Sequence, residues 1–197
     1  MAAGALLAAA VVIFAWNDSR GGTEDRGWLT YRDAKYGFSI SYPSDWIIER
    51  GHVSILPGPD QELHGIAFAV PPTMTTGTNL RSDSFISVSV VTANVRTEQG
   101  RCGSDLFLLE AKHTPITDAG RRYVYAEQTD AGAGNIYEQH AYALTGSDPC
   151  VGVLYFIHST NIGNYDPGTV REFDRAKLMA AFDRIRRSLV LSPRAHH

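Results

Sequence analysis

Apolar and polar residues alternate through much of the region from Trp28 to about His158, and this period of two is typical of β-strands with one buried face. The pattern predicts strands at 38–42, 47–48, 53–56, 66–70 and 85–91. Residues 121–129 and 135–144 flank a turn of Asp, Ala and Gly, which predicts a hairpin of two longer strands. Residues 151–159 are apolar at nearly every position, which indicates a central strand covered on both faces.

The C-terminal end has the period of a helix. Its apolar residues fall in one stripe at Leu178, Ala181, Phe182, Ile185 and Leu189. Asp166 and Pro167 can provide the N-cap and the first helical residue, and residues 169–172 match a capping box. Residues 104–112 (SDLFLLEAK) predict a second, short helix. Because the predicted strands follow one another through short turns, we expect an α+β fold, an antiparallel β-sheet with the C-terminal helix across one face.

The segment 1–16 is too apolar to begin an ordinary soluble domain. As a helix, residues 2–16 would be about 22 Å long, which is shorter than the hydrocarbon core of a bilayer at about 30 Å. This length favours a signal peptide, although basic residues in front of it are missing, and a longer apolar stretch would be an N-terminal membrane anchor. A buried N-terminal helix is the remaining alternative. The polar residues 17–27 then form a linker to a single domain at 28–191, followed by a tail at 192–197.

Cys102 and Cys150 are the two cysteines of the chain. Neither belongs to a Cys-x-x-Cys pair or lies at a metal-ligand spacing from histidines, so a zinc site or a redox motif is not indicated. In an exported domain two cysteines predict one disulfide, which would restrict the unfolded chain by about 4 kcal/mol. Two buried free thiols in a cytosolic protein are the alternative. The apolar leader and the cysteine pair together predict an extracytoplasmic protein, either periplasmic or membrane-anchored and facing outward.

The composition is that of a compact soluble domain. Hydrophobic residues make up 44% and charged residues 20% of 197 residues, whereas a disordered chain would have fewer apolar residues and more net charge. The formal net charge is −3, so no basic field predicts binding to nucleic acid. We therefore expect no nucleic-acid partner, and contact with a membrane through the N-terminal segment only.

Motifs of common reactions and cofactors do not occur in the chain, among them Gly-x-Ser-x-Gly, the P-loop and His-Glu-x-x-His. Residues 132–134 (GAG) begin like a dinucleotide-binding fingerprint, but Tyr137 replaces its last glycine and the segment joins two strands, so a turn is the better interpretation. His140 and His158 lie in neighbouring predicted strands and could approach one another, although such a pair is more often hydrogen-bonded structure than a metal site. We expect no cofactor, no bound metal and no catalytic residue.

One group of residues in the predicted hairpin is a candidate binding patch. Pairing in which residue numbers sum to 265 would place six polar or aromatic side chains on one face. The opposed pairs would be Tyr123 with Tyr142, Tyr125 with His140, and Glu127 with Glu138. Opposed carboxylates destabilise a sheet unless a shared proton or a bound cation compensates, so the set could bind a partner or a small ligand. Ordinary tyrosine packing, with both glutamates in water, is the simpler interpretation, and a slip of one residue would dissolve the pairing.

The loop at 71–83 (PPTMTTGTNLRSD) is a second candidate for binding. Thirteen residues are long for a link between paired strands, and long loops often have a function. Its one charged pair, Arg81 and Asp83, indicates no reaction, so a plain surface loop is the alternative.

A family resemblance rests on residues 36–46 (YGFSISYPSDW) and on the C-terminal helix with its segment 182–189 (FDRIRRSL). The predicted domain resembles the PsbP-like α/β/α sandwich family over most of its length. The resemblance implies function by binding other macromolecules, since the family includes a photosystem accessory protein, a nuclear transport factor and secretion chaperones. It supplies no catalytic motif. The leader and the cysteine pair fit the exported bacterial members of unknown role best. The motif also has a purely structural explanation, because its alternate apolar residues share one strand face and Trp46 can close the core.

Together these features predict a non-enzymatic binding or accessory protein, exported or membrane-tethered, with a protein partner in the cell envelope. Two alternatives stay open. A secreted or periplasmic hydrolase could use Glu127 and Glu138, since glycosidase-like chemistry needs two carboxylates about 5 to 9.5 Å apart. An inhibitor or immunity-type protein that blocks a secreted enzyme would also suit a small exported domain with a disulfide.

Overall fold

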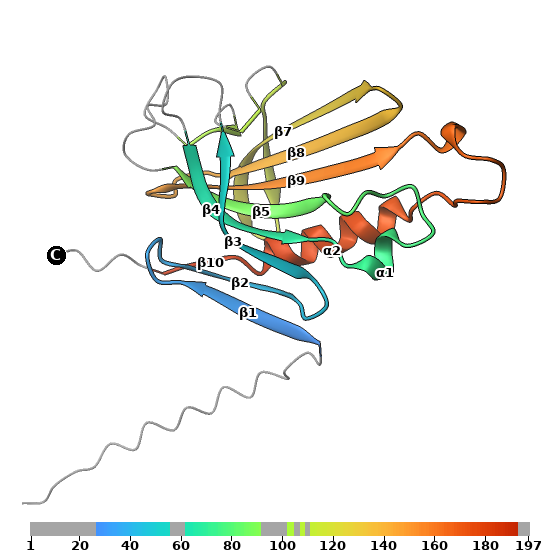
Figure 1. Ribbon diagram of the computed structural model, residues 1–197. Helices are drawn as coiled ribbons and strands as arrows, with labels where there is room; N and C mark the ends of the chain where they lie inside the picture. Colours follow the sequence, from blue (N-terminus) through green and yellow to red (C-terminus); the bar gives the residue numbers. More distant parts are fainter. Residues whose placement is uncertain (1–26, 56–61, 92–101, 105–106, 109–110, 193–197) are drawn as a thin grey trace, which may run out of the picture.

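The computed structural model describes residues 27–55, 62–91, 102–104, 107–108 and 111–192. The expected signal peptide or anchor, the linker up to residue 26 and the tail from residue 193 lie outside these residues. Among the helices of the described part, none has the length and apolar character needed to cross a membrane. The described residues form two antiparallel sheets with two α-helices, so the expected α+β class is confirmed (Figure 1).

The larger sheet has seven strands in the order β3-β4-β5-β9-β8-β7-β6, and all neighbours are antiparallel. The strands are β3 (Ile47–Ile55), β4 (Glu62–Ala69), β5 (Phe85–Val91), β6 (Thr114–Asp118), β7 (Arg121–Gly132), β8 (Asn135–Leu144) and β9 (Cys150–Thr160). β9 lies between β5 and β8, which confirms the central position predicted for residues 151–159. The middle of the sheet therefore joins segments that are far apart in the sequence.

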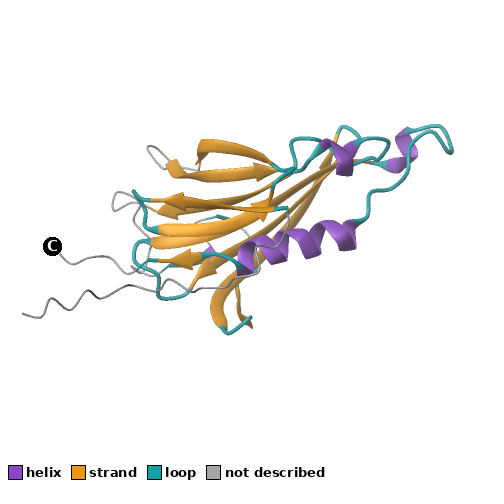
Figure 2. Ribbon diagram, turned by 90° about the horizontal axis from the view of Figure 1, so that it is seen from below, coloured by secondary structure: helices purple, strands orange, loops and turns teal. Residues whose placement is uncertain are grey.

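A smaller sheet and α2 complete the domain. The small sheet has the order β1-β2-β10, formed by β1 (Trp28–Asp33), β2 (Phe38–Pro43) and β10 (Val190–Leu191). The helices are α1 (Pro72–Thr75), α2 (Arg175–Arg187) and a 3-10 turn, η2 (Ile162–Asn164). α2 runs along one face of the larger sheet, as the sequence predicts, with the small sheet beside it (Figures 1 and 2). We call the face that α2 covers the inner face and the opposite one the outer face.

The core lies between the inner face, α2 and the small sheet. The predicted stripe supplies Leu178, Phe182 and Ile185 from α2 and Leu189 just after the helix, all at most 1% exposed. Alternate apolar residues of β2 and of the central strands pack on the same cluster. Trp46 closes this core with its ring 5.5 Å from Phe182, so the structural explanation of the 36–46 motif is correct.

The hairpin of β7 and β8 is confirmed, but its register is not the predicted one. Paired residue numbers sum to 267 instead of 265, since Gly132 pairs with Asn135. The chain reverses over only two residues, Ala133 and Gly134, whose φ angles are 49° and 80°. Two consecutive residues with positive φ form the tight hairpin turn that matches strand twist. Because the shift is two residues, each side chain keeps its face and changes its partner.

α2 begins at Arg175, so the predicted start at Pro167 is wrong. Its N-cap is Asp174, whose side chain accepts a hydrogen bond from a backbone amide of the first turn. The upstream chain cannot continue the helix because Gly168 has a φ of 81°. The side chain of Asn79 also holds the residue before this cap, by accepting a 2.9 Å bond from its amide. Contact with the loop at 71–83 therefore sets where the helix starts.

The short helix predicted at 104–112 is not found among the described residues of that segment, whereas residues 105–106 and 109–110 lie outside them. Phe107 and Leu108 both donate to the carbonyl of Ser104 at 2.9 Å, which closes a single turn. The ring of Phe107 packs on Gly152 of β9, where a Cβ atom would collide with it. The segment thus covers part of the outer face, and the short helix of the fold is α1 instead.

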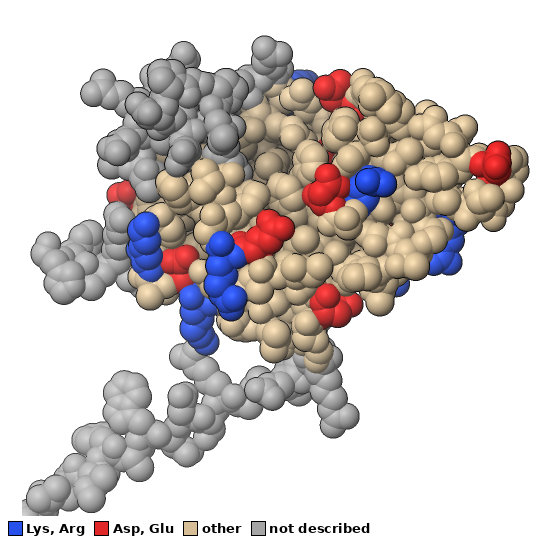
Figure 3. Space-filling model, in the orientation of Figure 1, with Lys and Arg blue, Asp and Glu red and all other residues tan. Residues whose placement is uncertain are grey.

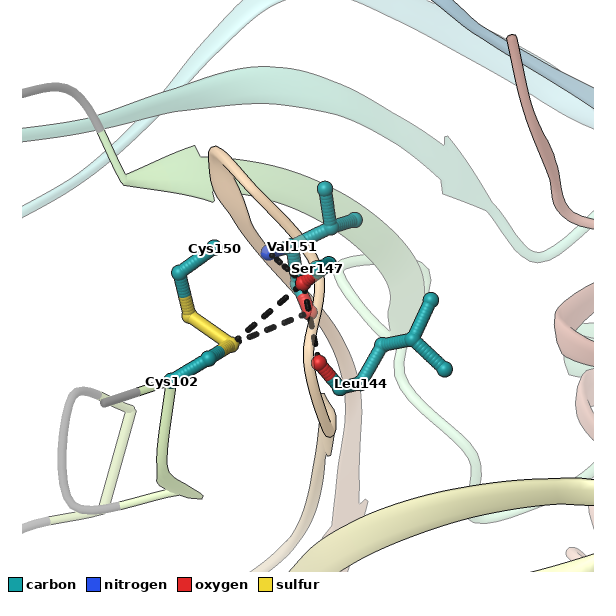
Figure 4. The surroundings of a disulfide bond; sticks show 5 residues. All are labelled: Cys102, Leu144, Ser147, Cys150 and Val151. Atoms are coloured by element: carbon teal, nitrogen blue, oxygen red, sulfur yellow. Dashed lines mark hydrogen bonds between the residues drawn. A yellow bond between two sulfur atoms is a disulfide. The ribbon is translucent and has the colours of Figure 1, made fainter. Parts of the chain in front are cut away.

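The predicted disulfide between Cys102 and Cys150 is confirmed, with the two Cα atoms 5.0 Å apart (Figure 4). It joins this covering segment to the first residue of β9. Ser147 supports the site, because its Oγ donates to the Leu144 carbonyl and accepts from the Val151 amide, both at 2.9 Å. The alternative of two free thiols is therefore wrong.

Candidate functional site

All six residues of the predicted patch lie on the inner face of β7 and β8, as expected. Their cross-strand partners differ from the prediction because of the corrected register. Tyr125 pairs with Tyr142, Glu127 pairs with His140, and Glu138 pairs with a threonine. Glu127 and Glu138 are therefore not cross-strand partners. This pairing does not call for a shared proton or a bound cation.

Two of the six residues of the predicted patch are part of the core under α2. Tyr123 and Tyr142 are 1% and 7% exposed. The guanidinium carbon of Arg186 lies 5.0 Å and 4.1 Å from the centres of these two rings. Burial raises the pKa of Tyr142 to about 12, which keeps its phenol neutral. These side chains cannot contact a partner in this conformation, and the simpler interpretation, tyrosine packing, describes them.

At the edge of this face, Tyr125, Glu127 and His140 form a chain of hydrogen bonds that we call the hairpin relay. The Tyr125 Oη donates to Glu127 Oε2 at 2.6 Å and lies 2.8 Å from His140 Nδ1. A phenol has one proton and the bond to Glu127 uses it, so Nδ1 must carry the proton of the second bond. A neutral His140 then has its lone pair on Nε2, which is buried and has no hydrogen-bond partner in the described residues.

The charges around the hairpin relay favour a neutral imidazole. Burial lowers the pKa of His140, while the carboxylates of Glu127 and Glu138 act in the opposite direction. Burial and the bond to Glu127 raise the pKa of Tyr125. Glu138 Oε2 lies 3.9 Å from His140 Nε2 but accepts two bonds from Arg175, at 2.9 Å and 2.6 Å. Its charge is thus compensated by the guanidinium.

This geometry does not favour a hydrolase built on the two carboxylates. The Glu127 side chain is 67% exposed, whereas Glu138 is 17% exposed and held by Arg175. Two carboxylates that flank a scissile bond must share one site, with one of them protonated in an apolar setting. Glu138 is paired with Arg175 and Glu127 is largely exposed, so neither carboxylate has the apolar setting of a general acid. The relay can order the sheet edge, and it leaves the lone pair of His140 Nε2 as a buried acceptor.

His140 and His158, which could have approached one another from neighbouring strands, lie on opposite faces of the sheet. In the register of β8 and β9, His140 pairs with Tyr155 and His158 with Tyr137. Positions 155 and 158 differ by an odd number, so their side chains alternate between faces. Within the described ranges, no group of three or more His, Cys, Asp or Glu side chains could hold a metal ion.

The outer face carries a set of contacting rings that we call the aromatic face. Its members, all half-buried, are His52, Phe85, Tyr137, Phe156 and His158. Ring centres lie 5.0 Å apart from His52 to Phe85, 5.2 Å from Phe85 to Phe156, and 4.5 Å from Tyr137 to His158. Tyr137 also stacks at 6.2 Å on Phe156, which joins the two halves. The surface over β5, β8 and β9 is largely uncharged (Figure 3).

Polar side chains fix the orientation of His158 within the aromatic face. Its Nδ1 lies 2.9 Å from both oxygens of Asp83, and its Nε2 lies 3.0 Å from Asn135 Oδ1. The Asp83 side chain is 61% exposed, so it also forms a polar rim beside the rings. The imidazole is therefore fixed by polar contacts at both ring nitrogens.

The loop at 71–83 is more ordered than a plain surface loop. It forms α1 and then pairs with β9 through a bridge between Leu80 and Ser159. The Asn79 side chain donates to the Thr160 carbonyl at 2.9 Å. A hollow of about 300 Å³ opens between this loop and the first turn of α2, with acidic and basic side chains both on its wall. The end of the loop places Asp83 at the aromatic face.

Sequence reasoning missed the aromatic face and the burial of Arg186. The sequence does contain a signal for the aromatic face, because the alternation of residues 85–91 places Phe85 on the strand face opposite to the core residues. Tyr137, Phe156 and His158 also occupy alternate positions in their strands. The order β5-β9-β8 is needed to bring these positions together, and the sequence pattern does not contain it.

No family model and no curated protein matches the sequence. The structure is similar to a crystal structure of a protein from Bacteroides thetaiotaomicron, with 12% identity and a TM-score of 0.47 over 83% of this chain. The chain spans 48%, about half, of that protein's length. It is also similar to the solution structure of PsbP from the cyanobacterium Synechocystis, with 15% identity, a TM-score of 0.47, and coverage of 88% of this chain and 97% of that one. Both likenesses lie under 25% identity and concern the fold alone.

Proposed function

We propose that the chain is a non-enzymatic binding or accessory module that works outside the cytoplasm, exported or tethered by its N-terminal segment. It holds a protein partner in the cell envelope against the aromatic face. The observation that carries this proposal is the continuous row of rings on the outer face, which crosses β3, β5, β9 and β8 with each ring in contact with the next.

A row of this kind has the physical properties of a protein interface. Aromatic rings supply large contact area at low conformational cost, and they are enriched at the centre of interfaces. Strand backbones and ring contacts already position these side chains, so binding costs little further ordering. Asp83 and Asn135 add hydrogen-bonding groups at the edge, which matches a polar rim around an apolar centre.

The aromatic face suits a partner better than the hairpin relay does. In the relay, His140 is 6% exposed, Tyr125 is half-buried and Glu127 is exposed, so the relay offers one ring and one carboxylate. The rings of the aromatic face are all partly accessible and form one surface. The relay instead lies at the edge of the inner face, where its hydrogen bonds join β7 to β8.

Work outside the cytoplasm is supported by the disulfide and by the apolar segment 1–16. Disulfides form and persist in oxidising compartments and are rare in the cytosol. Cys102 and Cys150 form one in this structure. A direct test fuses residues 1–27 to alkaline phosphatase, which is active only after export, and in parallel to β-galactosidase, which is active only in the cytoplasm. The proposal expects phosphatase activity from the first fusion, and β-galactosidase activity alone would contradict it.

Partner binding is tested by capture with the full-length chain. Immobilised wild-type protein is incubated with a detergent-solubilised envelope fraction of the source organism, in parallel with Tyr137→Ala and with the exposed-residue control Leu29→Ala. Loss of a ring at an interface centre costs about 2 kcal/mol or more, so Tyr137→Ala should weaken capture of the same partner by about 30-fold, and Leu29→Ala should not. Equal capture by all three folded proteins would refute the role of the aromatic face.

A further inference from the structure

A second surface lies at the other end of α2, beside the strand that follows this helix. A hollow of about 440 Å³ opens there between the β6–β7 turn, the β8–β9 loop and β10. Its wall is apolar at Leu144, Val190 and Leu191, and Val190 is 52% exposed. Arg121 and Arg122 are its charged residues, and neither Asp nor Glu contributes to the described wall.

No Asp or Glu of the described residues forms an ion pair with Arg121. Its cross-strand neighbour is Asp118, which would be the natural ion-pair partner. The Asp118 carboxylate is already engaged, because it accepts from Arg186 at 2.7 Å and from Arg187 at 2.8 Å and 3.0 Å. Arg121 Nη1 is buried and has no hydrogen-bond partner within the described part of the chain. A carboxylate that reaches the Arg121 guanidinium from the hollow would compensate this charge.

β10 offers a strand edge to the same hollow. Among the described strands β10 pairs only with β2, so it is an edge strand of the small sheet, whose strand order is β1-β2-β10. The amide of Ser192 donates to the carbonyl of Gly37 at 2.7 Å. Because an antiparallel ladder alternates, the amide and carbonyl of Leu191 then point away from β2, toward the free edge. An extended chain can pair with such an edge.

We propose that this hollow binds an extended peptide segment with a free C-terminal carboxylate. The segment pairs with the Leu191 backbone, its last apolar side chain lies against Leu144 and Val190, and its carboxylate accepts hydrogen bonds from Arg121. The charge of Arg121 favours an anionic occupant, because a guanidinium that is not paired with an acidic side chain can bind a carboxylate. The free backbone edge of β10 favours a peptide over other molecules that carry a carboxylate. None of this depends on the aromatic face, so either proposal can fail alone.

The test uses two hexapeptide libraries, randomised at the last three positions, one with free C-terminal carboxylates and one amidated. Peptides retained by the full-length chain are identified by mass spectrometry, and the best binder is titrated by NMR. We expect retention from the carboxylate library only, with amide shifts at Leu191 and Gly146. A charged hydrogen bond corresponds to about 10-fold or more in affinity, so Arg121→Gln should lose at least that. The matched control Arg81→Gln removes an exposed arginine elsewhere and should bind within about 2-fold.

Two further variants separate the possible outcomes. Leu191→Pro removes the amide that points to the free edge while the β2 ladder keeps its bonds, so the folded variant should bind the peptide more weakly. The Leu191 side chain also packs on the core, so binding is compared under conditions in which both proteins are fully folded. Tyr137→Ala should bind the peptide as wild type does, which separates this site from the proposed function. Equal retention of both libraries, no retention of either, or full binding by a folded Arg121→Gln protein would overturn the proposal.

Discussion

Replacement of Arg186 by methionine tests whether the charge buried under α2 holds the sheet and the helix together. Arg186 is 2% exposed and is the largest fully buried side chain among the described residues. Its Nε donates to Tyr155 Oη at 2.7 Å, and its Nη2 donates to Asp118 at 2.7 Å and to Asp183 at 3.1 Å. Methionine has a similar length and keeps most of the apolar contact, so the variant isolates the loss of the charge.

The expected loss follows from what the substitution leaves behind. Among the described residues, Asp118 and Asp183 would then keep Arg187 alone as a cationic partner, and removing one member of a buried ion pair costs about 3–5 kcal/mol. Arg187→Met is the matched control, because Arg187 contacts the same two carboxylates but its side chain is 46% exposed. Exposed ion pairs contribute about 1 kcal/mol or less, so this control should be nearly neutral.

Urea unfolding followed by tryptophan fluorescence measures the free energy of unfolding of Arg186→Met and of Arg187→Met. For a chain of this size a loss of 3–5 kcal/mol corresponds to a fall in melting temperature of about 6–20 °C for Arg186→Met. Arg186→Lys keeps the charge but not the planar donor fork, so its stability should fall between wild type and the methionine variant. If Arg186→Met costs no more than Arg187→Met, the buried network does not stabilise the fold and the reasoning is wrong.

Three other predictions concern the disulfide, the hairpin relay and Asp118. The double variant Cys102→Ser/Cys150→Ser opens a loop with a sequence separation of 48, so urea unfolding should show a loss of about 4 kcal/mol, and a loss under about 1 kcal/mol would contradict it. Burial lowers the pKa of His140 below its usual 6.5, so wild-type stability should fall as pH drops through that value. His140→Gln should flatten this part of the profile of urea midpoint against pH. An identical profile would show that His140 does not cause the pH dependence. The hydrogen bonds from Arg187 and Arg186 hold the pKa of Asp118 at about 2 against 3.8, so the stability it contributes is present above pH 3.8 and lost as pH falls through 2. Asp118→Asn should therefore be less stable at neutral pH and flatter in this acid range, measured by circular dichroism, and an unchanged acid limb would count against the pairing.

Local patterns of the sequence predict the strands well where one face is buried. The alternation of residues 85–91 matches β5, and the apolar run 151–159 matches a central strand. β1, β6 and β10 were not predicted, because each is short or largely exposed and its pairing is decided by the rest of the fold. The alternation of apolar and polar residues cannot identify a strand whose side chains are exposed to solvent on both faces.

Register and helix start depend on single backbone conformations that composition does not specify. Five residues of Asp, Ala and Gly allow several turns, and the observed one requires Ala133 at a φ of 49°, where glycine is the usual residue. Asp166 and Asp174 are both good N-caps, and the contact of Asn79 with the chain before α2 selects the second. Both choices come from packing between distant segments.

The candidate site shows the same division. The shared face of the six hairpin residues was predictable, since a shift of two residues preserves it, but the burial of Tyr123 and His140 under α2 was not. Arginine on a helix is usually at the surface, so nothing in the stripe of α2 indicates that Arg186 is buried. The aromatic face requires β9 between β5 and β8, a pairing of segments about seventy residues apart.

Site-specific photocrosslinking in living cells tests the aromatic face most directly. The photoreactive residue benzoylphenylalanine replaces Tyr137 or Phe85 in the full-length chain, and Leu29, which is 49% exposed on β1, in the matched control. The proposal predicts one discrete light-dependent adduct in the envelope fraction from either ring position and none from position 29. No adduct from the two ring positions, or the same adduct from all three, would contradict a partner bound at the aromatic face.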